Sequence, residues 1–289
     1  MQGWENVRMV CCDLDGTLLL EDHESVSGQV RGAIEEVTRR GILFVPTTGR
    51  AFNRIPGSVR SLPGVRYLIT SNGAEVWDLS GTSVLHGDYF RKDVLFRLLD
   101  YLDSLQVGWA VSRGTDTILD RKWRDYFLAH DRGDVLFRGF MRMTVGAENT
   151  RRLLEEDAAK VHKIIISELT KAQIETIHQA LRNWDEVCMA EATDHNMEIT
   201  VSGVTKFSGI CALCDHTGIP MSEVLAIGDS NNDLTMLRGA GFSAAMENGT
   251  REAKAAAQLT AASNEEDGVA RVLEQLAGES FEEKTKQQS

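Results

Sequence analysis

The stretch VRMVCCDLDGTL (residues 7–18) decides how this chain is expected to fold. With one exception its first six residues are apolar, as in a parallel strand that is buried on both faces. Asp13 and Asp15 follow, and the two-residue period of a strand directs both carboxylates to the same side. Gly16 permits a sharp turn, and Thr17 is expected to bond back to the backbone. We therefore expect both carboxylates at the carboxyl edge of a sheet, where open α/β sheets bind ligands.

The sequence on either side of this stretch predicts an α/β domain with a doubly wound, parallel, Rossmann-like sheet. Apolar residues recur at helical spacing between Val26 and Val37, with Ser25 as a possible N-cap. Further short apolar strands are expected at residues 42–45, 67–69, 224–227 and 241–246, and further helices around residues 207–214, 234–237 and 269–276. Such alternation of strands and helices favours right-handed βαβ units.

The middle of the chain has a different texture. Between residues 84 and 201, short strand patterns (109–111, 117–119, 161–166 and 197–201) mix with helical stretches near 95–105 and 174–181. We interpret residues 84–201 as an α+β domain inserted between two halves, 1–83 and 202–289, of one core. The polar end, residues 279–289, is predicted to be frayed.

Charge and cysteine content narrow the classes of partner and compartment. Acidic residues outnumber basic ones by 43 to 31, which gives a formal net charge of −12. Such a chain repels nucleic acid and anionic membrane surfaces, so we expect neither as a partner. No apolar run approaches the roughly 20 residues that cross a bilayer, and the first residues lack the pattern of a secretory signal. Five cysteines without framework spacing are typical of a reducing cytoplasm.

A second acidic cluster, GDSNND at residues 228–233, again follows a short apolar strand. Asp229 could complete a magnesium site with Asp13, because Mg²⁺ prefers oxygen ligands and two nearby carboxylates repel each other unless a cation joins them. Asn232 and Asp233 open the next helix, where the amide hydrogens favour anions. Helix capping explains one such residue but not the whole run. A shared metal explains both clusters better.

Paired carboxylates also suit covalent phosphoryl transfer. One carboxylate can attack phosphorus and form an acyl phosphate, while the other protonates the leaving oxygen and later activates water. For Asp13 and Asp15 taken alone, a solvated turn after a strand remains the alternative. Two weaker signals point the same way. The turn with Thr48 and Gly49 after the second strand could offer a hydroxyl and backbone N–H groups to phosphate oxygens, and Lys206 could neutralise the phosphate charge.

Five segments resemble, in order and spacing, the haloacid dehalogenase (HAD) superfamily: DLDGT (13–17), TGR (48–50), SNGA (71–74), Lys206 and GDSNND (228–233). The resemblance is closest to the Cof-type branch (subfamily IIB), whose members carry a large α/β cap inserted after the third core strand. The motifs span the predicted core and say little about the cap.

The resemblance implies a role for each matching residue around the metal. Asp13 is similar to the nucleophile, which is also a metal ligand. Asp15 is similar to the general acid and base, which also gives the metal its backbone carbonyl. Asp229 is similar to the second metal carboxylate, and the cofactor implied is Mg²⁺.

The remaining matches imply a phosphate site. Thr48 and Gly49 resemble the phosphate-binding turn, and Lys206 resembles the cation that holds nucleophile and phosphate together. Asn232 would contact the phosphoryl group, with Asp233 supporting the site from behind.

The leading hypothesis is therefore a Mg²⁺-dependent phosphatase that hydrolyses a sugar phosphate or a similar small phosphomonoester through an aspartyl-phosphate. The nearest alternative is a phosphomutase that returns the phosphoryl group to a second hydroxyl of the same sugar. A non-catalytic phosphorylatable switch is a third hypothesis, although Asp15 would shorten the life of its acyl phosphate. The partner expected is a small phosphorylated metabolite, and the chain is expected to be a monomer or a weak homo-oligomer.

Three other groups of residues favour structural roles. Cys211 and Cys214 match C-x-x-C but fall on the apolar face of a helix, so we expect both to be buried. His195 is the one histidine worth watching as a site residue. The aromatic stretch 123–127 could line a substrate pocket, and ordinary packing is the favoured interpretation.

Overall fold

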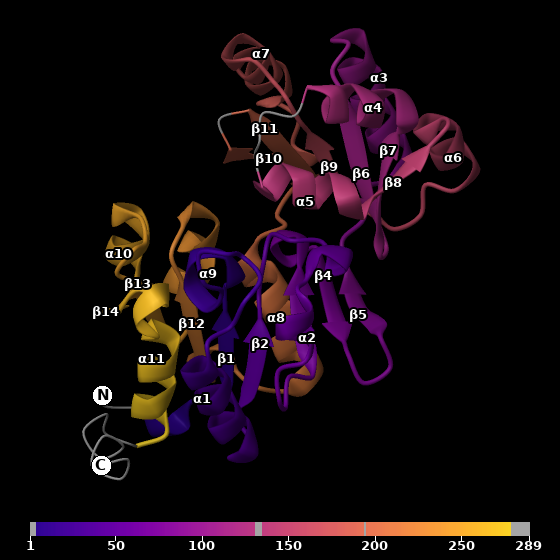
Figure 1. Cartoon of the computed structure of the whole chain (residues 1–289). Coiled ribbons are helices and arrows are strands. Elements are labelled where there is room, and N and C mark those ends of the chain that lie inside the picture. The colour runs from indigo at the N-terminus through magenta and orange to yellow at the C-terminus, as the bar shows by residue number, and fades with distance from the viewer. Residues whose placement is uncertain (1–3, 131–134, 194, 279–289) are drawn as a thin grey trace. The chain divides into compact units, whose positions relative to one another are not determined.

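A computed structural model describes residues 4–130, 135–193 and 195–278 of the chain (Figure 1). The predicted frayed end, residues 279–289, lies outside these ranges. The chain divides into a core unit (Met1–Gly49, Ile55–His86 and Thr205–Ser289) and an inserted unit (Arg50–Arg54 and Gly87–Val204). Within the described residues, none of the helices combines the length and the apolar character that crossing a membrane requires.

The core unit contains a five-stranded sheet with the order β14-β13-β12-β1-β2, and every pairing in it is parallel. Its strands are β1 (Met9–Cys12), β2 (Leu43–Pro46), β12 (Val224–Gly228), β13 (Phe242–Met246) and β14 (Leu259–Ala261). In the register, Met9 lies between Val224 and Leu43. The residues of β1 and β12 are all buried, as their continuous apolar sequences predicted. The predicted parallel sheet is confirmed.

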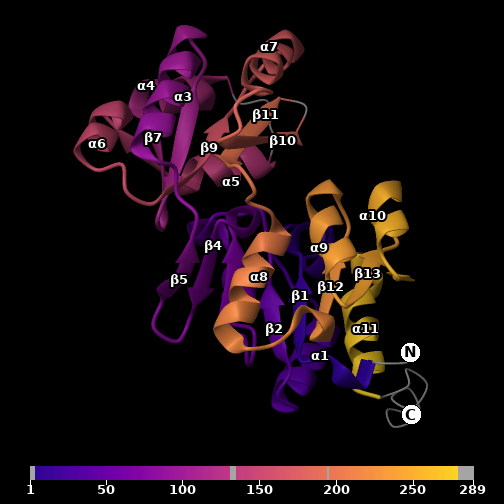
Figure 2. The same ribbon diagram turned by 180° about the vertical axis from the view of Figure 1, so that it is seen from behind.

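Helices cover both faces of this sheet, which confirms the doubly wound architecture. The helices of the core unit are α1 (Gly28–Arg39), α2 (Gly57–Arg60), α8 (Lys206–Thr217), α9 (Leu234–Gly239), α10 (Arg251–Ala256) and α11 (Gly268–Leu276). Figure 1 shows α1 and α11 together on one face, and Figure 2 shows α8 and α9 on the opposite face. Side chains of α8, α9 and α10 share one apolar cluster with Met9, Cys11 and Ala226 of the sheet.

The start of α1 differs from the prediction. Ser27, and not Ser25, caps the helix, because the Ser27 hydroxyl accepts a hydrogen bond from the Val30 amide at 3.1 Å. The Ser25 amide donates instead to the Asp22 carboxylate at 2.7 Å. This local turn holds the chain out of the helix for two more residues.

The third predicted strand is present but begins a separate sheet. β3 (Tyr67–Thr70) pairs antiparallel with β4 (Glu75–Asp78), and β5 (Ser83–Gly87) completes the order β3-β4-β5. A single parallel bridge between Thr47 and Ile69 connects β3 to the end of β2. The chain reverses direction after β3 in the short helical turn Ser71–Gly73, so β3 leads into a hairpin rather than into a crossover helix.

The inserted unit is an α+β structure built on a six-stranded sheet with the order β10-β11-β9-β6-β7-β8. Its strands are β6 (Trp109–Arg113), β7 (Asp116–Asp120), β8 (Thr144–Ala147), β9 (Val161–Ile166), β10 (Val187–Thr193) and β11 (Asn196–Val201). Its helices are α3 (Lys92–Ser104), α4 (Arg121–Ala129), α5 (Val135–Met143), α6 (Thr150–Glu156) and α7 (Lys171–Leu181). Residues of α3 and α7 pack on one apolar cluster, and Phe127 and Phe140 belong to a second.

Both cysteines of the C-x-x-C pair were predicted to be buried, but only Cys214 is. Cys214 is buried with 9% of its surface exposed, whereas Cys211 is intermediate in exposure. Leu213 takes the fully buried position beside Ile210 on α8. The buried face of α8 therefore shares Ile210 and Cys214 with the predicted one, but it includes Leu213 in place of Cys211.

His162 in β9 predicts an acid-sensitive inserted unit. Burial of this imidazole, together with the charge of the neighbouring Lys163 ammonium, lowers the pKa of His162 to about 3. In the unfolded chain this imidazole binds a proton near pH 6.5, whereas in the folded chain it stays neutral down to about pH 3. The contribution of neutral His162 to the free energy of unfolding is therefore fully present above pH 6.5 and is lost as the pH falls toward 3. We expect a loss of about 2 kcal/mol between pH 6.5 and 5.

Thermal unfolding of His162→Gln measures this effect. The variant should lose much of the decrease in Tm that the unchanged chain shows between pH 7.5 and 5. His130→Gln, at an exposed position, is the matched control and should keep the full decrease. Equal pH slopes in the unchanged chain and in His162→Gln would contradict the assignment.

Candidate active site

The predicted site residues meet at the carboxyl edge of the core sheet because backbone hydrogen bonds continue past the ends of the strands. The Asp13 amide donates to the Ile227 carbonyl at 2.9 Å, which holds the end of β1 against β12. The Thr47 amide donates to the Cys12 carbonyl at 2.8 Å, which holds the next strand end on the other side. The segments after β1, β2 and β12 therefore emerge side by side.

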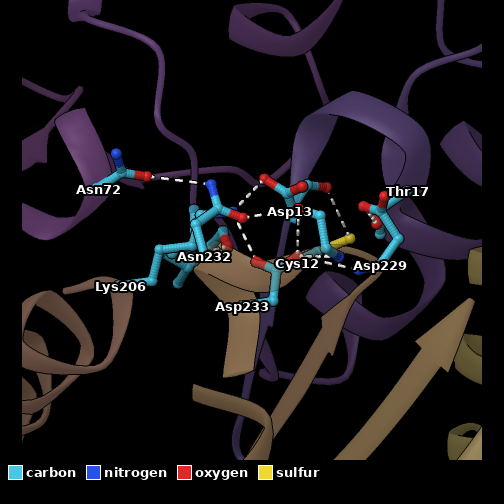
Figure 3. Close-up of polar contacts among 11 residues, drawn as sticks. Cys12, Asp13, Thr17, Asn72, Lys206, Asp229, Asn232 and Asp233 are labelled. Atoms are coloured by element: carbon cyan, nitrogen blue, oxygen red, sulfur yellow. Dashed lines mark hydrogen bonds and ion pairs between the residues drawn. The ribbon is translucent and has the colours of Figure 1, made fainter. Parts of the chain in front are cut away.

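Asp13, Asp229 and Asp233 form one acidic cluster around Lys206 (Figure 3). One carboxylate oxygen from each aspartate lies within 4.8 Å of the others. Lys206 Nζ donates at 2.6 Å to Asp13 Oδ1 and at 2.6 Å to Asp233 Oδ1. The Lys206 side chain is completely buried, and Asp13 is 4% exposed. Lys206 and Asp229, which follow Asp13 by 193 and 216 positions, thus lie beside its carboxylate, as the motifs predicted.

The charges in this cluster are not balanced by Lys206 alone. Burial raises the pKa of Asp13 well above its ordinary value, against the opposing charge of Lys206, and the Asp233 and Asp229 carboxylates raise it further. Burial likewise raises the pKa of Asp229. Burial disfavours the Lys206 ammonium, but the Asp13 and Asp233 carboxylates outweigh it and raise the pKa of Lys206. Three carboxylates around one ammonium leave excess negative charge in a poorly hydrated site.

This donor set fits a divalent cation. It offers only oxygen atoms, which is the ligand type that Mg²⁺ prefers. Asp233 is committed elsewhere, since its Oδ1 accepts from Lys206 and its Oδ2 accepts from the amides of Asp229 and Ser230 at 2.9 Å each. Asp13 and Asp229 are therefore better placed than Asp233 to bind a metal ion.

Gly16 and Thr17 position Asp229. The prediction that Thr17 bonds back to the backbone is wrong, because its hydroxyl donates to Asp229 Oδ1 at 2.7 Å. Gly16 has φ 77°, and a Cβ added there would lie 2.6 Å from Asp229 Oδ2. The turn after β1 therefore packs directly on the second acidic cluster, and only glycine leaves room for this contact.

Asp15 lies outside the acidic cluster. Among the described residues, the group of neighbouring metal-binding side chains consists of Asp13, Asp229 and Asp233. The Asp15 carboxylate Oδ1 instead lies 2.9 Å from Nδ1 of His23, and both side chains are more than one third exposed. His23 lies in the loop between β1 and α1 with φ 56°, and no motif or spacing in the sequence had indicated it as a site residue.

Thr48, Gly49 and Asn232 meet at the turn Ser71–Gly73. The Thr48 amide donates to the Ile69 carbonyl and its carbonyl accepts from the Asn72 amide, each at 2.9 Å. Asn232 Nδ2 donates to Asn72 Oδ1 at 3.1 Å (Figure 3). Thr48 is buried, whereas Asn232 is exposed. The segment SNGA (71–74) matched the family pattern, but the sequence assigned no role to any of its residues. In the structure Asn72 contacts two segments of the predicted phosphate site, at Thr48 and at Asn232.

The remaining candidates belong to the inserted unit. His195 Nδ1 lies 3.1 Å from the Leu169 carbonyl at the turn before β11. In α4, Trp123 stacks on Phe127, which is buried, whereas Tyr126 is 48% exposed. The Tyr126 ring packs edge-on against Trp123 and stacks on His130, so both aromatic side chains agree with the packing interpretation although Tyr126 is partly exposed.

Comparison with known proteins gives relatives along nearly the whole chain. A family profile described as haloacid dehalogenase-like hydrolase matches residues 10–273. The chain is 31% identical over 280 residues to the 5-amino-6-(5-phospho-D-ribitylamino)uracil phosphatase YitU of Bacillus subtilis, covering 92% of this chain and 96% of that protein. It is 26% identical over 290 residues to the phosphatase YwpJ of the same organism, covering 93% and 100%.

Solved structures share the fold. A haloacid dehalogenase-like hydrolase from B. subtilis superposes with a TM-score of 0.77 at 25% identity, covering 93% of this chain and 99% of that one. A HAD subclass IIB sugar phosphatase has the same fold, with a TM-score of 0.76 at 20% identity and coverage of 94% and 99%. With the motifs gathered at one edge of a doubly wound sheet, these matches establish that the chain is an enzyme of the haloacid dehalogenase-like hydrolase family.

Proposed function

We propose that this chain is a Mg²⁺-dependent phosphohydrolase that acts on a small phosphomonoester through an aspartyl-phosphate on Asp13. The observation that carries the proposal is the acidic cluster of Asp13, Asp229 and Asp233 around the buried Lys206. Mg²⁺ would be held by Asp13, Asp229 and the Asp15 carbonyl. When bound, it would supply positive charge that offsets the phosphoryl oxygens and the carboxylates.

Asp13 acts as the nucleophile in this mechanism. Its carboxylate oxygen attacks phosphorus in line, the new O–P bond forms, and the bond from phosphorus to the leaving oxygen breaks through a loose transition state. Lys206 holds the attacking carboxylate at 2.6 Å and offers positive charge to the phosphoryl oxygens. The Thr48 hydroxyl, the Gly49 backbone amide and the side-chain amide of Asn232 would donate to the other oxygens. Asp233 keeps Lys206 in place from the opposite side.

Asp15 moves the proton. It gives its proton to the leaving oxygen in the first step, then takes one from the water that attacks the aspartyl-phosphate, which restores Asp13 and releases inorganic phosphate. Its exposed position beside His23 gives it access to a substrate and to water. Because it lies outside the acidic cluster, its gain or loss of a proton does not change the number of charges in direct contact with Asp13.

A sugar phosphate or a phosphorylated sugar alcohol is the proposed substrate class. The relative with 31% identity is named for a substrate whose phosphate is carried by a ribityl chain. The inserted unit, residues 87–204, would act as a cap that reads the leaving group, in keeping with a fold shared with a subclass IIB sugar phosphatase. We place the enzyme among phosphatases of small metabolites.

Release of inorganic phosphate from a panel of phosphorylated sugars and sugar alcohols, with and without Mg²⁺, tests the proposed function. Activity should require the metal, and no isomeric phosphate should accumulate. Isomer formation without release of inorganic phosphate would identify a phosphomutase instead. A phosphorylated Asp13 that persists for minutes without turnover would identify a switch protein.

Asp229→Asn tests the metal site separately from turnover. Mg²⁺ bound to the folded chain raises its stability in proportion to the logarithm of the metal concentration above Kd. The unchanged chain should therefore gain several degrees of Tm in millimolar Mg²⁺, and Asp229→Asn should gain little. If the two chains respond equally to Mg²⁺, Asp229 is not a metal ligand.

Asp15→Asn tests the acid and base. General acid catalysis contributes about 10²–10⁴-fold, and most where the leaving group is a poor one. Hydrolysis of an alkyl phosphate should fall by about 10³-fold, and hydrolysis of p-nitrophenyl phosphate should fall much less in its first step. Steady-state rates with both substrates, together with the pre-steady-state burst of nitrophenol, measure the difference. An equal loss of first-step rate for both leaving groups would remove Asp15 from this role.

A further inference from the structure

The turn Ser71–Gly73 adopts a costly backbone conformation beside the phosphate site. Three successive residues have positive φ: 51° at Ser71, 57° at Asn72 and 102° at Gly73. Residues with a Cβ enter this region only when the surroundings demand it, and such residues gather at functional sites. Gly73 is required for a second reason, because a Cβ there would lie 1.9 Å from the Thr205 carbonyl oxygen.

This turn contacts all the segments to which we assign phosphate binding. It meets the loop after β2 through the hydrogen bond from the Asn72 amide to the Thr48 carbonyl at 2.9 Å. It meets the start of α8, which carries Lys206, through the close approach of Gly73 to Thr205. It meets the loop after β12 through the bond from Asn232 Nδ2 to Asn72 Oδ1 at 3.1 Å (Figure 3).

The Asn72 side chain fixes both the direction and the surroundings of the Asn232 amide. Asn232 is exposed, and its Oδ1 accepts a hydrogen bond from the Ser230 hydroxyl at 2.7 Å. With Oδ1 held by Ser230 and one Nδ2 hydrogen held by Asn72, the second Nδ2 hydrogen has a defined direction. The Asn72 amide also covers Gly49, since a Cβ added at Gly49 would lie 2.9 Å from Asn72 Oδ1.

We propose that Asn72 is a positioning residue that holds the amide of Asn232 for the phosphoryl group. The strained turn places the Asn72 side chain between Gly49 and Asn232, so that donors from two loops approach the same phosphoryl oxygens. Ordering this exposed amide before substrate arrives removes an entropic cost from the transition state. The inference rests on the proposed phosphatase function and adds a residue to it.

Four variants separate this role from a purely structural one. Asn72→Ala removes the side chain and keeps a Cβ at positive φ, whereas Asn72→Gly removes the side chain and relieves the backbone. Asn72→Asp keeps the acceptor oxygen for Asn232 but adds negative charge beside the phosphate. Thr82→Gly is the matched control, because Thr82 has φ 48° in the exposed turn before β5.

The expected results are specific to each variant. Asn72→Ala and Asn72→Gly should both lower kcat/KM for a small phosphomonoester by roughly tenfold, the size of one lost hydrogen bond. Asn72→Asp should keep kcat within about threefold and raise KM, because its charge repels the phosphate and the acceptor remains. Thr82→Gly should leave both constants unchanged.

A double-mutant cycle with Asn232→Ala decides whether Asn72 acts through Asn232. If it does, adding Asn72→Ala to Asn232→Ala should lower kcat/KM by less than about twofold further. Independent losses that multiply in the double variant would overturn the inference, as would recovery of activity in Asn72→Gly or an Asn72→Ala enzyme within twofold of the unchanged chain. Absence of phosphatase activity in the unchanged chain would instead overturn the proposed function, which keeps the two failures distinguishable.

Discussion

Asp13→Asn is expected to lower kcat by at least about four orders of magnitude while leaving the fold intact. An amide oxygen cannot replace the carboxylate as the atom that attacks phosphorus, so the covalent step is lost and not merely slowed. The exchange is nearly isosteric, and Lys206 keeps its 2.6 Å contact with Asp233. Removing one of three clustered carboxylates also relieves repulsion, so Tm should not fall.

The measurement combines turnover, unfolding and capture of the intermediate. Rapid acid quenching of the unchanged chain with substrate should give a hydroxylamine-sensitive phosphoryl group on the peptide that contains Asp13, and Asp13→Asn should give none. Asp116→Asn makes the same chemical change at an exposed position of β7 and should retain full activity. An Asp13→Asn enzyme with undiminished phosphatase activity would overturn the assignment of the nucleophile.

The parallel sheet was predictable because its strands are buried on both faces. The runs at residues 9–12 and 224–227 are continuously apolar, a pattern that neither an exposed strand nor an amphipathic helix produces. The hairpin after β3 was not predictable in the same way. Its direction depends on positive φ at Ser71 and Asn72, which residue preference does not signal and which contacts with the loop after β2 and with α8 impose.

The convergence of the site was predictable from topology, since parallel strands end at the same edge and carry Asp13 and Asp229 there. Side-chain partners were less predictable. Thr17 was expected to make a local bond, but its partner Asp229 lies 212 positions away, where local preference carries no information. The contact of Asp15 with His23 depends on the path of the loop between β1 and α1, and no periodic pattern fixes that path.

Asp233 caps the helical turn after β12 and also takes part in the charge cluster around Lys206, so the two interpretations of this residue hold together. Its Oδ2 accepts from the amides of Asp229 and Ser230, which is the capping role. Its Oδ1 binds Lys206 at the same time. One carboxylate therefore fixes the loop after β12 and aims the buried ammonium at Asp13.

Lys206→Met should have the second large effect, on stability and on turnover together. Methionine has a similar length and no charge, so the variant removes the ammonium and leaves Asp13 and Asp233 buried without it. Breaking a buried ion pair in this way costs about 3–5 kcal/mol, which for a chain of this size corresponds to a decrease in Tm of about 6–20 °C. Turnover should fall by about 10²–10³-fold or more, because the charge that faces the phosphoryl oxygens is lost.

Lys163→Met provides the matched control, since Lys163 is also buried and pairs with Glu198 at 2.8 Å in the inserted unit. Both variants should lower Tm, but only Lys206→Met should gain more Tm from Mg²⁺ than the unchanged chain does, because the cation then relieves repulsion that the lysine no longer offsets. Adding Asp13→Asn to Lys206→Met should recover part of the lost stability, since one unpaired buried carboxylate is removed. If the double variant is no more stable than Lys206→Met, unpaired charge is not what destabilises the site, and the electrostatic account of this cluster is wrong.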